Sequence, residues 1–200
     1  MPSWVVGLIV ALSPVVGGTV FAAESQVDRR VGAVNQARNG EIDSALMLLK
    51  TLHSETPNDP GIRNDLAVVL SWAGQDVAAD ALLVNEEVGL LPDYVLTAYA
   101  KTLRNLKRWQ DAIQAYDALA LRDENNVDAK LGAVMALADT SDEGGTERGM
   151  SRLNEIERAE LGDDQLVQYY LACGYLNERS RKYIRALDCY NQGLLRNRTR

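Results

Sequence analysis

Residues Pro92 to Asn126 read PDYVLTAYAKTLRNLKRWQDAIQAYDALALRDENN, and this stretch decides the fold. Within it, Tyr94 to Leu106 and Trp109 to Leu121 each place apolar or small side chains three or four residues apart, which is typical of an amphipathic helix. A basic turn, Lys107-Arg108, separates the two segments. The pattern predicts two antiparallel helices joined by a short turn.

A small residue followed four positions later by a large one recurs along the chain. The pairs are Ala45/Leu49, Ala79/Leu83, Ala112/Tyr116, Gly149/Leu153 and Ala186/Tyr190. Gly40 and Gly74 each lie five positions before the small residue, where the link between two helices must turn sharply. The chain therefore consists of repeated helix pairs, and Pro92 to Asn126 is the clearest copy.

The small residues of these pairs recur at intervals of 33 to 37 residues. This period and the small-then-large pair match the tetratricopeptide repeat. We expect an all-α, right-handed solenoid of about five such helix pairs, with the first helix of each pair on the concave side. Besides the central pair, the expected helices are Val27–Arg38 with Ile42–Leu52, Ile62–Ala73 with Val77–Leu90, one from Val127 with its partner after Gly149, and Asp164–Glu178 with Arg181–Leu195. Residues Ser141 to Gly149 contain three glycines and no apolar side chain, which predicts a surface loop.

The amino-terminal end has the features of a secretory signal. Val5 to Val20 is almost continuously apolar and leads into small residues, with a predicted cleavage after Ala22. A retained membrane anchor is the alternative, but the apolar run is shorter than the roughly 20 residues that a spanning helix needs. We expect residues 1–22 to be a signal peptide and residues 23–200 to form the solenoid, with export to the periplasm.

Composition excludes several classes of function. The formal net charge is −7 over 200 residues, which implies no nucleic-acid partner. His53 is the only histidine, and no phosphate-binding, dinucleotide-binding or nucleophile motif is present. We expect no enzymatic activity, no cofactor and no metal site.

Cys173 and Cys189 lie sixteen residues apart, one on each expected helix of the fifth pair. After export they could form a disulfide. Cysteines at helix-packing positions also serve as small buried apolar residues, and we favour that interpretation.

If the repeat register is right, the concave groove has a mixed polar and aromatic lining, suited to an extended ligand such as a peptide or a glycan. The candidate binding residues are Asn64, Ser71, Tyr94, Thr97, Lys101, Arg104, Asp128, Tyr175 and Glu178. A second candidate is an acidic patch in the second pair, formed by Asp76, Asp80, Glu86 and Glu87. Such charges usually form a solvated helix face, and a cationic ligand is the alternative.

A narrower resemblance rests on residues that the repeat itself does not require. They are Leu70-Ser71-Trp72-Ala73-Gly74-Gln75-Asp76, Tyr99, Arg104-Asn105-Leu106, Arg108-Trp109-Gln110, Asn125-Asn126 and Leu137-Ala138-Asp139. Over roughly positions 30 to 160 the chain resembles the periplasmic repeat domain of bacterial poly-β-1,6-N-acetylglucosamine export porins. In that family the repeat domain precedes an outer-membrane barrel, for which this chain has no strands, so the resemblance leaves open a longer exporter or a free-standing repeat protein.

The resemblance implies a periplasmic binding module that assists export of the biofilm polysaccharide, engaging the N-acetylglucosamine polymer, a polysaccharide deacetylase, or both. Ammonium groups on a partly deacetylated polymer would be held by the acidic patch through salt-screened contacts. The competing hypothesis is a general scaffold of the cell envelope that binds a protein partner and no glycan.

Overall fold

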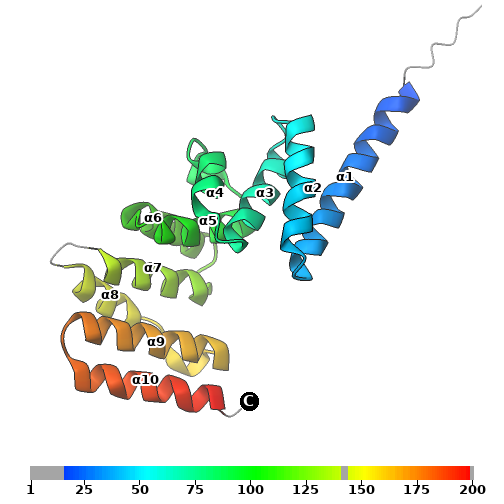
Figure 1. Ribbon diagram of the computed structural model, residues 1–200. Helices are drawn as coiled ribbons and strands as arrows, with labels where there is room; N and C mark the ends of the chain where they lie inside the picture. The colour runs from blue at the N-terminus through cyan, green and yellow to red at the C-terminus, as the bar shows by residue number, and fades with distance from the viewer. Residues whose placement is uncertain (1–15, 141–143, 199–200) are drawn as a thin grey trace, which may run out of the picture.

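The computed structural model describes residues 16–140 and 144–198, and helix pairs follow one another along a curved array (Figure 1). The helices are α1 (Val16–Arg38), α2 (Ile42–Glu55), α3 (Pro60–Trp72), α4 (Asp76–Leu83), α5 (Asp93–Asn105), α6 (Trp109–Arg122), α7 (Val127–Asp139), α8 (Gly145–Asn154), α9 (Asp163–Arg179) and α10 (Tyr183–Arg198), with short 3-10 helices η1 (Val88–Leu90) and η2 (Arg158–Glu160). Strands are absent from these ranges. The predicted all-α solenoid of five helix pairs is confirmed.

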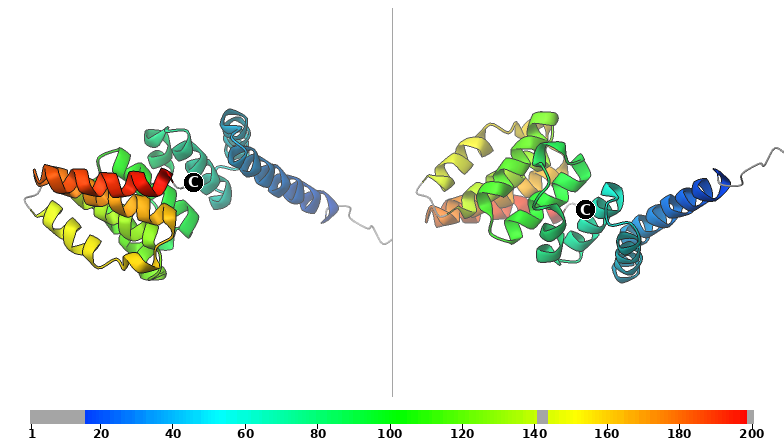
Figure 2. Two further views of the ribbon diagram at one scale, coloured as in Figure 1. Left: turned by 90° about the horizontal axis from the view of Figure 1, so that it is seen from below. Right: turned by 90° about the horizontal axis from the view of Figure 1, so that it is seen from above.

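Each end of the array is formed by one pair of neighbouring helices. Views from below and above show α1 and α2 at one end and α9 and α10 lying together at the other (Figure 2). The first fifteen residues of the predicted signal peptide lie outside the described residues, and the expected cleavage after Ala22 falls within α1. None of the helices in the described ranges is both long and apolar enough to cross a bilayer.

Small residues lie where the two helices of a pair cross. Ala45, Ala79, Ala112 and Ala186 are all at most 4% exposed. Gly149 occupies the same position in the fourth pair, where an added Cβ would lie 3.4 Å from the Val134 carbonyl oxygen and 3.6 Å from the Leu137 Cβ of α7. The predicted register is therefore correct in all five pairs.

The turns between paired helices use a left-handed backbone residue in four pairs. Gly40 and Gly74 have φ of 90° and 70°, and Lys107 and Arg181 adopt φ of 61° and 59° at the corresponding positions. Each lies five residues before the small crossing residue. Sequence reasoning found only the two glycines, because Lys and Arg carry no sign that the backbone takes a conformation favoured by glycine.

The helix expected over Val77–Leu90 is shorter than predicted. It ends at Leu83, and η1 follows. The Arg122 guanidinium donates hydrogen bonds to the carbonyl oxygens of Gly89 (2.7 Å) and Leu91 (2.8 Å). Backbone carbonyls outside a helix need partners, and Arg122, which lies on α6, supplies them.

The surface loop expected over Ser141–Gly149 is also wrong in part. Gly145 to Gly149 form the first turns of α8, and Gly145 and Gly149 are buried. Residues 141–143 lie outside the described residues. Glycine suggested a loop, but here its lack of a side chain serves close helix packing, and tertiary contacts override its low helix propensity.

The interpretation of Cys173 and Cys189 as separate buried thiols is wrong, because a disulfide joins them across α9 and α10 with a Cα–Cα distance of 5.8 Å. Two glycines explain the proximity. A Cβ on Gly174 would lie 2.3 Å from the Tyr190 ring, and one on Gly193 would lie 3.3 Å from the Tyr170 Cβ. The helices thus approach closely enough to bring the Cα atoms of the two cysteines within the distance that a disulfide spans.

Candidate functional site: the concave groove

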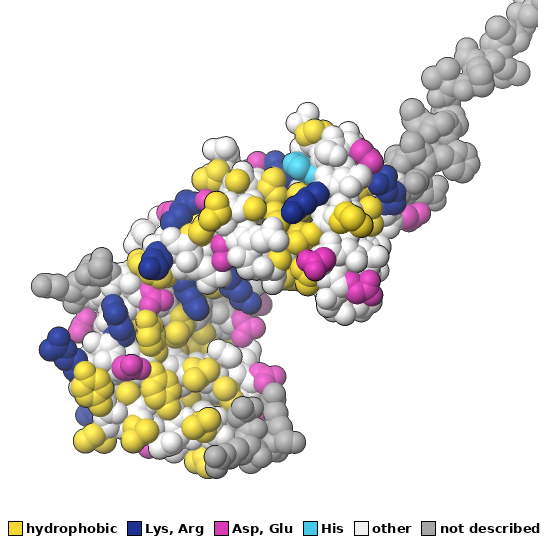
Figure 3. All heavy atoms as spheres, in the orientation of Figure 1, with side chains coloured by type: hydrophobic (Ala, Val, Ile, Leu, Met, Phe, Trp, Pro, Cys, Tyr) yellow, Lys and Arg dark blue, Asp and Glu magenta, His cyan; other side chains and the backbone are white. Residues whose placement is uncertain are grey.

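The concave side contains a cavity of about 480 Å³ between α5, α6, α7 and α9, which we call the central groove. Its lining is Thr97, Lys101, Arg104, Asn105, Tyr116, Leu119, Asn126, Asp128, Ala129, Leu131, Gly132, Met135 and Gln168. Four of the predicted binding residues, Thr97, Lys101, Arg104 and Asp128, are therefore brought together. Figure 3 shows a hollow on the inner side of the curved array, where basic, acidic and apolar side chains lie next to one another.

Two cations lie next to each other in the central groove. Lys101 and Arg104 are separated by one turn of α5, so they lie on the same side of that helix. Neither forms an ion pair with any residue in the described part of the chain. Asp128, which lies on α7, is the one carboxylate in the described lining. The groove is thus locally basic in a chain of net charge −7.

Tyr116 and Gly132 form part of the groove lining, where α6 and α7 meet. An added Cβ at Gly132 would lie 2.3 Å from the Tyr116 ring. Tyr116 is 4% exposed and so cannot move aside easily. Burial is the main cause that raises its pKa, while the charge of Arg104 acts in the opposite direction. These contacts fix the wall of the groove rather than leaving it adaptable.

The predicted residues on α9 do not line the central groove. The Tyr175 hydroxyl donates a hydrogen bond to Asp139 and so links α9 to α7. Glu178 accepts a 2.8 Å hydrogen bond from Tyr190 and links α9 to α10. From α9, only Gln168 reaches the cavity lining.

Ser71 and Asn64 are engaged in packing rather than presented to a ligand. Thr102 donates to the Ser71 hydroxyl (2.9 Å), which in turn donates to the Ala98 carbonyl (3.3 Å), so Ser71 joins α3 to α5. Asn64 is 7% exposed. Ser71 is half-buried, and neither residue lines the central groove.

A second concave cavity of about 330 Å³ lies near the amino-terminal end, and we call it the aromatic groove. It is lined by Arg30, Val31, Val34, Asn35, Arg38, Asp65, Val68, Val69, Trp72 and Tyr94. Trp72 and Tyr94 remain about half exposed, at 49% and 51%. Tyr94 was predicted as a binding residue, whereas Trp72 and the α1 residues were missed. The sequence signal for Trp72 is an aromatic residue at the end of a first helix, beside the turn.

Asp65 organises the aromatic groove from below. It accepts a 2.8 Å hydrogen bond from the Tyr94 hydroxyl and lies 3.2 Å from the Arg30 Nε. Burial raises the pKa of Asp65, against the lowering effects of the Tyr94 hydrogen bond and the Arg30 charge. One buried carboxylate thus fixes side chains of both α1 and α5.

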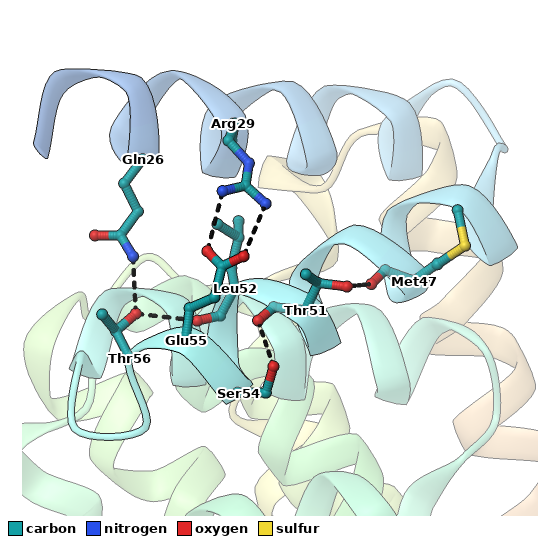
Figure 4. A network of polar contacts seen from close by, with 8 residues as sticks. All are labelled: Gln26, Arg29, Met47, Thr51, Leu52, Ser54, Glu55 and Thr56. Atoms are coloured by element: carbon teal, nitrogen blue, oxygen red, sulfur yellow. Dashed lines mark hydrogen bonds and ion pairs between the residues drawn. The ribbon is translucent and has the colours of Figure 1, made fainter. Parts of the chain in front are cut away.

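Contacts between α1 and α2 hold the first wall of the aromatic groove in place. Arg29 pairs with Glu55 at 3.0 Å, and Gln26 donates a 3.0 Å hydrogen bond to the Thr56 hydroxyl (Figure 4). The Thr56 hydroxyl donates in turn to the Leu52 carbonyl at 3.0 Å. Because these residues fasten α1 along the end of α2, Arg30 and Arg38 keep a defined position.

The predicted acidic patch is largely occupied by partners within the chain. Asp80 accepts from the Tyr99 hydroxyl (2.8 Å) and from Arg108 (2.7 Å). Asp76 accepts from Asn105 at 3.1 Å, and Glu86 pairs with Arg63 at 2.7 Å. Glu87 remains exposed. None of the four lines either concave cavity, so the patch is mainly a set of contacts between helices.

No group of three or more His, Cys, Asp or Glu side chains in the described ranges could hold a metal ion.

The comparisons with known proteins identify the fold. Neither a family model nor a curated protein matches the chain. Among solved structures, MamA from Desulfovibrio magneticus RS-1 superposes with a TM-score of 0.63 at 17% identity, covering 88% of this chain and 96% of that one. The chain has a tetratricopeptide-repeat solenoid fold.

Two further structures have the same fold. A tetratricopeptide repeat protein from Parabacteroides merdae gives a TM-score of 0.62 at 14% identity, covering 86% of this chain and 66% of that one. A Podosopora anserina protein described as a kinesin light chain with nearly identical TPR-like repeats gives 0.64 at 13%, covering 86% and 95%. At these identities the likeness concerns the fold, and function has to be argued from the grooves.

Proposed function

We propose that the protein is an interaction scaffold whose central groove holds an extended, acidic segment of a protein partner. The observation that carries this proposal is the pair Lys101 and Arg104, which lie in a concave cavity without an ion pair among the described residues. Elsewhere in the same chain Arg29, Arg30, Arg63, Arg108, Arg122 and Arg152 pair with carboxylates. Cations left unpaired in a groove complement carboxylates brought by a ligand.

The rest of the lining suits an extended chain. Gln168 carries an amide that can both donate to and accept from a peptide backbone. The Asn105 amide already donates to Asp76, and the Asn126 Oδ1 accepts from the Ala129 backbone N–H at the start of α7. Leu131 and Met135 provide the lining with apolar surface. A segment with acidic side chains at one end and an apolar side chain further along therefore matches the groove.

Selection from a displayed random-peptide library tests this proposal. We expect enriched peptides to be acidic and to lose affinity when Lys101 and Arg104 are both replaced by Glu. The matched control replaces Lys50 and Lys130, which are exposed and lie outside the groove lining, by Glu. Enrichment that is equal for the wild type and the groove variant would refute the proposal.

A second candidate is a glycan ligand, and one observation favours it. Trp72 and Tyr94 present half-exposed aromatic surface along the aromatic groove, and such rings can stack on sugar faces. This candidate includes poly-β-1,6-N-acetylglucosamine export, with a polysaccharide deacetylase as the protein partner. Binding of the polymer's ammonium groups by Asp76, Asp80 and Glu86 receives little support, because these carboxylates already have partners within the chain.

Calorimetric titration with N-acetylglucosamine oligomers, fully acetylated and partly deacetylated, tests the glycan candidate. Oligomer binding that is lost in Trp72→Ala but kept in the Lys101→Glu/Arg104→Glu variant would favour a glycan over a peptide ligand. No heat of binding with either oligomer would remove it.

Periplasmic location is part of the proposal. The disulfide between Cys173 and Cys189 supports it, since disulfides persist in oxidising compartments. Cell fractionation with mass determination of the mature amino terminus tests it. We expect a periplasmic protein that starts near Ala23, whereas an uncleaved chain in the cytoplasm would contradict this location.

A further inference from the structure

The outer face of α10 carries an apolar stripe that no described helix covers. Ile184, Leu187 and Leu194 are 88%, 61% and 55% exposed, and the exposed Asn191 lies between the last two. The opposite side of α10 packs on α9 through Ala186 and Gly193, which are buried. The last helix is therefore apolar on two sides, and one of them has no partner in the described structure.

One position of this stripe is buried in an internal helix, whereas the counterparts of the other three in α6 are exposed (Gln110) or half-buried (Asp117 and Ala120). Leu187 lies at the position that Ile113 holds in α6, where the crossing residues are Ala186 and Ala112. Ile113 is 5% exposed, because α6 is followed by α7, which packs against it. Leu187 thus lies at a helix-packing position.

The spacing of the stripe is that of a coiled coil. Ile184, Leu187, Asn191 and Leu194 follow one another at intervals of three, four and three residues, which are a and d positions of a heptad repeat. Isoleucine occupies an a position and leucine both d positions. This combination favours two parallel strands, and a single asparagine at an a position specifies register and a two-stranded state.

We propose that α10 pairs in parallel with α10 of a second copy of this chain, about a twofold axis that passes beside Asn191. The interface is isologous, so each residue of the stripe faces its own counterpart or its neighbour on the second copy. The proposal is independent of the central groove. Its consequence is a dimer with two sets of grooves, which raises the avidity for a partner that carries repeated segments.

The charges beside the stripe agree with self-pairing. In a parallel pair, side chains at the g and e positions approach each other across the seam, and here the g positions are Tyr183 and Tyr190 and the e positions are Asp188 and Leu195. Tyr190 packs on Gly174 and donates to Glu178 of α9 in its own chain, so Tyr183 with Asp188 is the pair that meets across the seam. None of the four is basic. Lys182 and Arg185, which are exposed, lie at the f and b positions, away from the seam.

Tyr183 and Asp188 add a polar contact of a kind that the chain already uses. Within one chain, tyrosine hydroxyls donate to carboxylates at Tyr94–Asp65, Tyr99–Asp80 and Tyr190–Glu178, each at 2.8 Å. Tyr183 is 63% exposed and makes no such bond within its own described chain. In the pair, it is placed to donate to Asp188 of the second copy.

A seam of two heptads is shorter than a standard interface of roughly 1,200 to 2,000 Å². We therefore expect a reversible dimer in the micromolar range. Sedimentation equilibrium over a concentration series measures it. Leu187→Glu should raise the dissociation constant roughly 100-fold or more, because two buried leucines are lost per dimer.

The matched control is Leu121→Glu on α6, where the leucine is 83% exposed but belongs to no heptad stripe. It should leave the dissociation constant unchanged. Unchanged helicity by circular dichroism in both variants excludes unfolding as the cause. A wild type that stays monomeric at the highest concentration, or a dimer that survives Leu187→Glu, overturns the proposal.

Cross-linking tests the parallel register separately. In Asn191→Cys, the new thiols of two copies should face each other and oxidise to a covalent dimer, because an a position meets its own counterpart. Gln192→Cys, one residue further on and at a b position, should cross-link much more slowly. Equal rates for the two variants, or faster linking of Gln192→Cys, contradict a parallel seam.

Discussion

The ring of Tyr116 lies directly over Gly132, so that an added Cβ on the glycine would come within 2.3 Å of the ring. This contact joins α6 to α7 and forms part of the wall of the central groove. Gly132→Ala should lower the free energy of unfolding by about 1 to 3 kcal/mol, because the core has no room for the methyl group. Denaturant unfolding measures the loss.

Gly32→Ala is the control for this experiment. Gly32 lies in α1 with no heavy atom within 4 Å of an added Cβ. The free energy of unfolding should stay equal or rise by up to about 1 kcal/mol, since alanine favours a helix more than glycine does. A Gly132→Ala protein as stable as the wild type would show that the contact is looser than described.

Asp80 holds the third helix pair against the second. Asp80→Ala leaves the buried Tyr99 hydroxyl without its acceptor and Arg108 without one of its carboxylates. We expect a loss of about 1 to 3 kcal/mol in the free energy of unfolding. Glu87→Ala, at an exposed position, should change it by less than about 0.5 kcal/mol. Similar effects for the two variants would mean that the acidic residues form a solvated face.

Alkaline pH should weaken the fold through two tyrosines. Burial and hydrogen bonds to Asp65 and Glu178 raise the pKa of Tyr94 and of Tyr190 to about 12, from an ordinary value of 10.0. Because the folded state binds these protons more tightly, their stabilising contribution is complete below pH 10 and is lost as the pH rises through about 12.

Unfolding measured over that pH range checks the alkaline effect. The free energy of unfolding should fall less steeply with pH in the Tyr94→Phe/Tyr190→Phe double variant than in the wild type. Identical slopes would contradict the assignment. Tyrosinate absorbance during the titration provides a second, independent readout.

Reduction of the disulfide should destabilise the last helix pair. The bond closes a loop with a sequence separation of 16 residues, for which chain entropy gives about 3 kcal/mol. The melting temperature should fall in the presence of a reductant. The Cys173→Ala/Cys189→Ala variant should melt at the same temperature with and without it. A wild type that is indifferent to reductant would show that the bond does not form in solution.

Sequence reasoning found what depends on local spacing. The crossing residues Ala112 and Gly149 and the face of α5 that carries Lys101 and Arg104 follow from periodicity alone. It failed where a distant residue decides the local structure. Arg122 supports the backbone after α4, and Gly174 lets α9 and α10 approach until two cysteines meet.

The same limit applies to the candidate site. Ser71 and Tyr175 lie on first helices, but hydrogen bonds from Thr102 and to Asp139 engage them in packing. The carboxylates of α4 looked like an exposed patch, and their partners Tyr99, Asn105 and Arg108 come from the next pair. Which polar side chains remain free for a ligand follows only from contacts between helices.

A charge-swap titration tests the central claim most directly. One acidic peptide selected on the wild type is titrated by calorimetry into the wild type, the Lys101→Glu/Arg104→Glu variant and the Lys50→Glu/Lys130→Glu control. We expect the groove variant to bind about 10-fold or more weakly, the control to bind as the wild type does, and added salt to weaken the wild-type complex. A peptide with its acidic residues changed to lysine should regain affinity for the groove variant. Equal affinity of the acidic peptide for all three proteins, independent of salt, would contradict a basic central groove as the binding site.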